Sequence, residues 1–141
     1  MNVAMQNQAP NDGPNGARRP PTKELELLWT DVCAVEDIWP NSGVAALLGG
    51  EQIALVRVGE SDVVYGLSNF DPFSEAFVIA RGIVGDRNGR PKIASPIFKQ
   101  NFDLETGVCM DDPSVSLLGY PTRVRDGRVE VAVADAPAAQ P

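Results

Sequence analysis

The sequence contains no histidine among its 141 residues. This absence excludes catalytic centres that use an imidazole, a histidine general base, and any metal site with a histidine ligand. Only two cysteines are present, Cys33 and Cys109, which are too few for a four-thiolate iron–sulfur site. We expect both thiols to be free and buried; a disulfide or redox pair between them is the alternative.

Long apolar runs and an excess of basic residues are also missing. The longest aliphatic run, residues 44–48, has five residues, whereas a membrane-spanning helix needs about 18 or more. Twelve basic and 19 acidic residues give a net charge of −7, which argues against a nucleic-acid partner and against an anionic membrane surface. The start of the chain lacks a basic region followed by an apolar core, so we expect a cytoplasmic protein without a signal peptide.

The composition changes near both ends of the chain. Twelve of the first 22 residues are Asn, Gln, Pro or Gly, and such a segment cannot bury enough apolar area to offset its ordering entropy. We therefore predict a disordered N-terminal tail over residues 1–22, one folded domain over residues 23–134, and a short disordered tail over residues 135–141.

Short β-branched runs separated by turns dominate the predicted domain. We expect strands at residues 27–32, 44–48, 52–58 and 63–67. Six to nine such strands with Gly and Pro turns predict an all-β fold, an antiparallel sandwich or partly open barrel with short or no helices. The only helix candidate is one turn over residues 74–81, with Ser74 as its N-cap.

The clearest hairpin lies near the C-terminus, in "RVRDGRVEV". A two-residue loop at residues 126–127 pairs Val124 with Val129 on the face that we expect to be buried. The same register places Arg123 opposite Glu130, an oppositely charged pair on the other face. The consecutive glycines at residues 49–50 predict a second tight hairpin.

Two further stretches carry the functional signal, "SNFDPF" at residues 68–73 and "ASPIFKQNFDLETG" at residues 94–107. In order and register they resemble the two loops of Rieske proteins, which bind a two-iron cluster through Cys-x-His and Cys-x-x-His. The scaffold residues of that pattern are kept, including Asn69, Pro72 and Pro96. All four ligand positions are changed and hold Asp71, Phe73, Ser95 and Phe98. The resemblance thus implies a Rieske-like fold without a cluster, because phenylalanine cannot bind iron.

The stretch "ARGIVGD" narrows the resemblance to one family when it is read together with "SPIFKQNFDLETG" from the second loop region. Together they are similar to the small subunit of cytoplasmic NAD(P)H-dependent nitrite reductase. This implies an accessory chain with no catalytic residue and no cofactor of its own, in an oxidoreductase that reduces nitrite to ammonium during nitrate assimilation. In this family the large subunit, the implied partner, carries the FAD, the siroheme, the iron–sulfur cluster and the NAD(P)H site.

The end of the domain where the two loops of a Rieske protein would bind the cluster has two compatible interpretations. Phe73 and Phe98 could pack together with Pro72, Pro96 and Ile97 as an apolar plug, since burying a phenylalanine contributes about 1.5–3 kcal/mol. Alternatively, the end could be a docking surface for the large subunit. The candidate interface comprises Phe70, Asp71, Pro72, Phe73, Phe98, Lys99 and Gln100.

Other motifs have ordinary structural explanations. We interpret "GDRNGRP" at residues 85–91 as a hairpin turn rather than a phosphate loop, and residues 111–113 as a surface turn rather than part of a cation site. Trp29 and Trp39 are expected to be packing residues, with Trp39 an alternative interface anchor. A free-standing binding module unrelated to nitrite reduction is the rival function.

Overall fold

The computed structural model describes residues 28–133. The predicted tails at residues 1–22 and 135–141 lie outside the described residues. Residues 28–133 form twelve strands and two 3-10 turns with no α-helix, which confirms the all-β prediction. No helix in this range is long and apolar enough to cross a membrane.

The strands are short and entirely antiparallel in their pairing. In chain order the elements are β1 (Leu28–Ala34), η2 (Val35–Asp37), β2 (Ser42–Leu48), β3 (Glu51–Arg57), β4 (Val64–Ser68), β5 (Phe70–Asp71), β6 (Ala76–Phe77), η3 (Ile79–Arg81), β7 (Ile83–Arg87), β8 (Arg90–Ala94), β9 (Asn101–Asp103), β10 (Gly119–Tyr120), β11 (Thr122–Arg125) and β12 (Arg128–Val133). The prediction of six to nine strands was too low, because β5, β6 and β10 have two residues each and are too short to show alternation.

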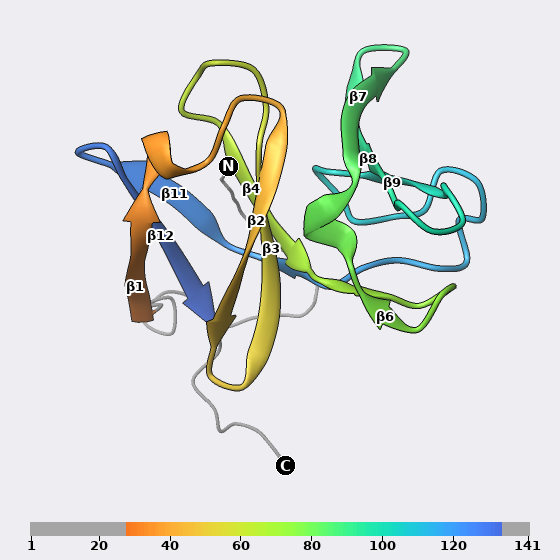
Figure 1. The fold of residues 1–141 in the computed structure, drawn as a ribbon, viewed down its shortest axis with the longest axis horizontal. Coiled ribbons are helices and arrows are strands. Elements are labelled where there is room, and N and C mark those ends of the chain that lie inside the picture. Colours follow the sequence, from red (N-terminus) through yellow and green to blue (C-terminus); the bar gives the residue numbers. More distant parts are fainter. Residues whose placement is uncertain (1–27, 134–141) are drawn as a thin grey trace, which may run out of the picture.

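Two sheets build one half of the molecule, which we call the base lobe. They have the strand orders β1-β12-β11 and β10-β4-β3-β2. In Figure 1 these strands lie on the left and in the centre. The predicted β11–β12 hairpin is confirmed residue by residue, since Val124 pairs with Val129 and Arg123 with Glu130. The Arg123 guanidinium also lies 3.9 Å from the centre of the Trp29 ring, which makes this aromatic side chain a packing residue.

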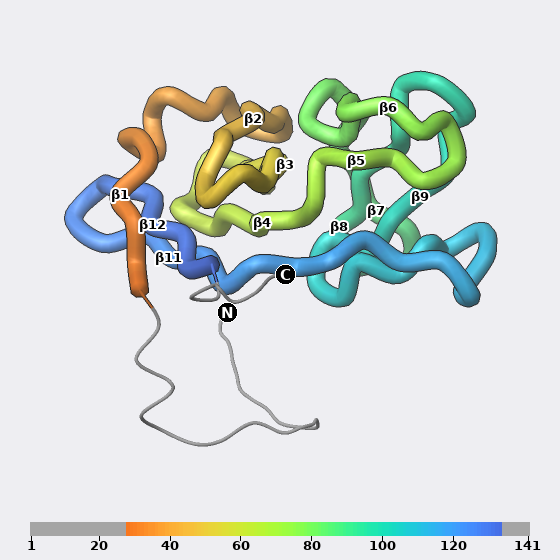
Figure 2. Tube along the Cα trace, turned by 90° about the horizontal axis from the view of Figure 1, so that it is seen from below, coloured from red at the N-terminus to blue at the C-terminus, as the bar shows by residue number. Residues whose placement is uncertain are grey.

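The remaining strands form the tip lobe, from the two-stranded β5-β6 sheet and the three-stranded β7-β8-β9 sheet. Figure 2 shows the two lobes side by side, with the chain crossing from β4 into β5 and returning through the segment before β10. The predicted turn at residues 85–91 is the β7–β8 hairpin. Its two central residues, Asn88 and Gly89, both have positive φ, as a type I′ turn requires.

Two clusters of buried apolar side chains form the core of the molecule. One lies inside the base lobe and includes Ile53, Leu55 and Val129. The other joins the lobes, because it combines Val56 of β3 with residues of the tip lobe such as Phe102. Both cysteines are free, as expected; Cys109 is fully buried in the second cluster and Cys33 is half-buried.

The predicted helical turn over residues 74–81 was wrong. The chain there forms β6 and then the 3-10 turn η3, and Ser74 caps neither of them. The sequence explains the difference, since the apolar residues of this stretch are contiguous and offer no single helical face. Ile79 and Ala80 of η3 are instead buried against the sheet.

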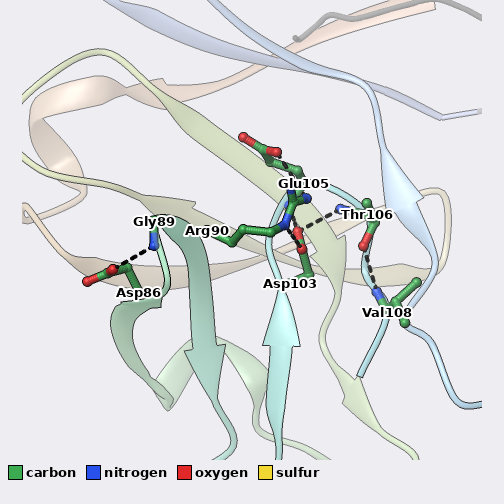
Figure 3. A network of polar contacts seen from close by, with 7 residues as sticks. All are labelled: Asp86, Gly89, Arg90, Asp103, Glu105, Thr106 and Val108. Atoms are coloured by element: carbon green, nitrogen blue, oxygen red, sulfur yellow. Dashed lines mark hydrogen bonds and ion pairs between the residues drawn. The ribbon is translucent and has the colours of Figure 1, made fainter. Parts of the chain in front are cut away.

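The "FDLETG" stretch begins in β9 and continues into a carboxylate-centred turn, drawn in Figure 3. Asp103 is nearly buried and accepts hydrogen bonds from the backbone N–H groups of Glu105 and Thr106, at 2.7 and 3.2 Å. Its second oxygen pairs with Arg90 of β8, which also pairs with Glu105 at 3.1 Å. Asp103 therefore fixes both the turn and its attachment to β8.

Candidate functional site

The residues singled out from the sequence lie on two adjacent loops of the tip lobe. Loop A comprises residues 68–77 and contains β5 and β6; loop B comprises residues 95–100, between β8 and β9. Loop A follows directly from the base-lobe strand β4. The two loops lie together because a side chain of each forms a hydrogen bond with the other.

Asn69 fixes the start of loop A. It is almost fully buried, its side-chain oxygen accepts a hydrogen bond of 2.7 Å from the Ala80 N–H, and its amide nitrogen donates to Gln52 at 3.2 Å. Its own backbone N–H donates to the Gln52 carbonyl oxygen at 2.9 Å. Asn69 thus joins β3, the start of loop A and η3, which explains why an asparagine stands there.

Asp71 and Ser95, at the two former cysteine positions, contact each other directly. The Ser95 hydroxyl donates a hydrogen bond of 2.5 Å to Asp71 Oδ2, between residues that are 1% and 0% exposed. Asp71 Oδ1 also accepts from the N–H groups of Phe73 and Ser74, at 2.8 and 3.4 Å. A carboxylate and a hydroxyl therefore close the site where the resemblance would place metal ligands.

The hydrogen bonds of Asp71 control its ionisation. Burial raises the pKa of this carboxyl group, but the hydrogen bonds from the Ser95 hydroxyl and from the N–H groups of Phe73 and Ser74 outweigh it. The net effect lowers the pKa below its ordinary value, so Asp71 is a buried carboxylate at neutral pH.

The two former histidine positions do not form the predicted plug. The Phe73 ring is partly buried against Phe102 of β9, with a centroid separation of 6.1 Å, and it belongs to the cluster that joins the lobes. Phe98 is 58% exposed instead. Phe73 was drawn inward because the buried Phe102 ring offers it an apolar partner next to loop A.

The exposed apolar side chains of the tip come from both loops. Phe98 and Ile97 of loop B are 58% and 44% exposed, and Phe77 of loop A is 54% exposed. Phe77 lies against Phe70 with ring centroids 5.1 Å apart. We call Phe70, Phe77, Ile97 and Phe98 the tip patch. Phe77 was missed from the sequence, because only the β5–β6 pairing places it opposite Phe70.

The other predicted interface residues belong to the same two loops. Lys99 is exposed and turns the chain sharply, with a φ of 65°. Gln100 and Pro72 are half-buried, and the carbonyl oxygen of Gln100 accepts a hydrogen bond of 2.9 Å from the Ser95 N–H. Asp71 is fully buried, so it supports the loops that carry the tip patch and is not part of the exposed surface.

The side chains at the four ligand positions do not fit a two-iron cluster. Such a cluster needs thiolate or imidazole donors, but Phe73 and Phe98 have no donor atom, and Asp71 and Ser95 are hydrogen-bonded to each other. Within residues 28–133, no group of three or more His, Cys, Asp or Glu side chains is arranged to hold a metal ion. Asp111 and Asp112, the other acidic candidates, form hydrogen bonds with Asn101 and Ser114 as a surface turn.

A surface cavity of about 800 Å³ lies away from the tip patch, where β4 and β10 meet the "FDLETG" turn. Its lining includes Tyr65, Leu67, Glu105 and Tyr120. Burial raises the pKa of Tyr65, and the adjacent Glu105 charge raises it further. No sequence pattern indicated this cavity, because its walls come from three segments that are distant in the chain.

The comparisons with known proteins agree with this geometry. Residues 28–132 match the model of the Rieske-like [2Fe-2S] domain family. The chain is 46% identical over 103 residues to the nitrite reductase (NADH) small subunit of Escherichia coli K12, covering 73% of this chain and 95% of the relative. The chain belongs to the family of nitrite reductase small subunits.

The fold comparison supports the same family. The NMR structure of the E. coli protein NirD has a TM-score of 0.72 and 44% identity, and the match covers 77% of this chain and 98% of that chain. The chain is therefore similar, over nearly its whole described part, to the small subunit of an oxidoreductase that works with a large subunit.

A third relative concerns the partner. The nitrite reductase [NAD(P)H] large subunit of Klebsiella oxytoca is 40% identical over 103 residues, which cover 73% of this chain and only 11% of the relative. In that protein a domain similar to this chain is thus part of the large-subunit polypeptide itself. The partner predicted for the small subunit, a nitrite reductase large subunit, is supported by this relative.

Proposed function

We propose that this chain is the accessory, cluster-free small subunit of a cytoplasmic NAD(P)H-dependent nitrite reductase of nitrate assimilation. The FAD, the siroheme, the iron–sulfur cluster and the nucleotide site belong to the large subunit. The chemistry of nitrite reduction then takes place on the partner, and the small subunit stabilises or orients it.

The contact between Asp71 and Ser95 is the observation that carries this proposal. Each side chain is the hydrogen-bond partner of the other, at the place where a Rieske protein would bind its redox cluster. A carboxylate and a hydroxyl that are both fully buried cannot serve as electron carriers at physiological potentials, so a role in docking fits this site better than a role in electron transfer.

The tip patch is the surface through which we propose that the chain docks on the large subunit. Three of its four side chains are exposed, from two loops that are joined beneath them. Aromatic side chains on a preorganised support are typical anchors of protein interfaces, because little conformational entropy is lost when they are covered. The large subunit would cover Phe98 and Phe77 with an apolar surface of its own.

Co-expression with the cognate large subunit tests this proposal. We expect the two chains to copurify, and we expect deletion of the small subunit to lower the stability of the large subunit or its nitrite turnover with NADH or NADPH. Unchanged stability and turnover after the deletion would contradict an accessory role.

Substitution of Phe98 by Asp tests the docking surface. We expect Phe98→Asp to weaken binding to the large subunit about tenfold or more, since it places a charge in an apolar contact. The matched control is Leu47→Asp, a change at a similarly exposed apolar side chain on β2 of the base lobe. Equal binding by wild type and Phe98→Asp, with the fold intact by circular dichroism, would reject the tip patch as the interface.

A further inference from the structure

The hydrogen bond between Asp71 and Ser95 is also the connection between the two loops. The residues are 24 positions apart, one in β5 and one directly after β8. Within residues 28–133, no other hydrogen bond joins loop A to loop B. The arrangement of the loops relative to each other therefore depends on this contact and on apolar packing such as that of Phe73 on Phe102.

Each partner also organises its own loop. Asp71 Oδ1 accepts the N–H groups of Phe73 and Ser74, which sets the turn after β5. The Ser95 hydroxyl oxygen accepts the Ile97 N–H at 3.4 Å, and the Ser95 N–H donates to the Gln100 carbonyl oxygen, which closes loop B. One buried pair thus fixes the conformation of both loops as well as their contact.

Physical chemistry makes the two groups interdependent. A buried carboxylate is strongly unfavourable unless hydrogen bonds replace its water, and hydrogen bonds to an ionised acceptor are stronger than those between neutral groups. Removal of the Ser95 hydroxyl would leave Asp71 Oδ2 without its donor. Removal of the Asp71 carboxylate would leave the Ser95 hydroxyl and the N–H groups of Phe73 and Ser74 without their acceptor.

We propose that Asp71 and Ser95 form a loop latch, a metal-free closure that holds loops A and B in the arrangement that a cluster would otherwise impose. The latch positions the tip patch from beneath, since Ile97 and Phe98 follow Ser95, and Phe70 and Phe77 belong to the hairpin of Asp71. The positioning of a docking surface rests on the function proposed above; the closure of the loops does not.

Amide hydrogen exchange of the isolated chain tests the closure. We expect Asp71→Ala and Ser95→Ala each to speed exchange at Phe73, Ser74 and Ile97 about tenfold or more, because the latch then opens at lower free energy. The double variant should exchange no faster than the faster single variant, since both changes break one contact. Asp71→Asn keeps an acceptor for the N–H groups and a donor for the Ser95 hydroxyl, so it should retain most of the protection.

A second Asp–Ser hydrogen bond in the chain is the matched control. Asp112 Oδ1 accepts from the Ser114 hydroxyl at 2.7 Å in an exposed turn. Asp112→Ala and Ser114→Ala should leave exchange at Phe73 and Ile97 unchanged. If Asp71→Ala does not fold, Ser95→Ala still decides the question, because it removes a single oxygen atom; unchanged loop exchange in Ser95→Ala overturns the latch.

Binding to the large subunit separates the latch from the proposed function. If the wild-type chain does not bind the large subunit, the docking proposal fails, while the exchange experiment still decides the latch. If the wild type binds, we expect Ser95→Ala to weaken binding severalfold and Asp71→Asn to bind nearly as wild type. Loosened loops with unchanged affinity in Ser95→Ala would overturn the positioning role.

Discussion

Ionisation of Asp71 couples the stability of the fold to pH. Its pKa is lowered in the folded chain although burial opposes this, because hydrogen bonds from Ser95, Phe73 and Ser74 favour the charged form. A carboxyl group with a lowered folded-state pKa contributes stability above its unfolded pKa, near 3.9, and this contribution is lost as pH falls through the folded-state pKa.

We therefore predict that Asp71→Asn is less stable than the wild type at pH 7 and that the difference shrinks below about pH 4. Urea unfolding at several pH values measures it. Asp111→Asn is the comparison, since the pKa of Asp111 is also lowered, first by the Asn101 N–H, in an exposed position. Its effect should have the same sign and be smaller, because solvent screens an exposed charge. A difference for Asp71→Asn that grows on acidification would contradict the assignment.

Asn69 provides a second prediction at the scale of single residues. Asn69→Ala removes the acceptor of the buried Ala80 N–H and the donor of the partly buried hydrogen bond to Gln52. We expect a loss of about 1–3 kcal/mol in the free energy of unfolding. Ser116→Ala, at an exposed position, should stay within about 0.5 kcal/mol of the wild type. Equal stability of both variants would show that Asn69 is not a structural anchor.

Single residues also show what the sequence could and could not predict at the site. The lost ligands were evident from the residue types at positions 71, 73, 95 and 98, since neither loop retains a thiolate or an imidazole. The contact between Asp71 and Ser95 was not predicted, because no local pattern shows which side chains of two loops point toward each other. The inward position of Phe73 likewise depends on the Phe102 ring, which lies 29 positions later in the chain.

At the scale of elements, a hairpin could be predicted from the sequence only where its turn residues formed a recognisable pattern. The β2–β3 and β11–β12 hairpins were predicted, because Gly49-Gly50 and Asp126-Gly127 supply two consecutive residues that tolerate positive φ. The β5–β6 hairpin was not, since two-residue strands have no alternation and Glu75, its positive-φ residue, carries no such signature. Sequence patterns thus predicted the base lobe better than the tip lobe.

A comparison of two turn glycines predicts how firmly each turn is held in the fold. Gly127 and Gly107 have similar positive φ values of 74° and 81°, but a Cβ at Gly127 meets open space whereas one at Gly107 would lie 2.3 Å from the Leu117 carbonyl oxygen. We expect Gly127→Ala to cost about 1 kcal/mol of stability, from backbone strain alone.

Gly107→Ala should cost several kcal/mol, since the Leu117 backbone must move as well. Thermal unfolding of the two variants measures the difference. Comparable melting temperatures would mean that the segment before β10 yields easily, and that the "FDLETG" turn is less firmly held than its hydrogen bonds indicate.

At the scale of the whole molecule, the main prediction is that the purified protein is colourless. The purified chain, expressed in cells that assemble iron–sulfur clusters, should lack visible absorbance and contain about zero iron and sulfide, because the Rieske ligand set of two thiolates and two imidazoles is not present. Elemental analysis and an absorbance spectrum measure this. Stoichiometric iron with a visible band would contradict the cluster-free assignment.

The junction of the two lobes predicts how the molecule unfolds. The cluster that contains Val56 and Phe102 belongs to both lobes, so the tip lobe shares its core with the base lobe. We expect one cooperative transition, with coincident midpoints for the tryptophans of the base lobe and for backbone circular dichroism. Two separated transitions would show that the tip lobe opens while the base lobe stays folded.

The pairing of Leu28 with Val133 has a consequence for protein engineering. The first and last described strand residues are neighbours on the base lobe, away from both tip loops (Figure 1). A polypeptide can therefore enter and leave this domain at one place without crossing the tip patch. A single-chain protein that joins this domain to other domains is geometrically simple to make, and in the Klebsiella oxytoca relative a region similar to this chain is part of the large-subunit polypeptide.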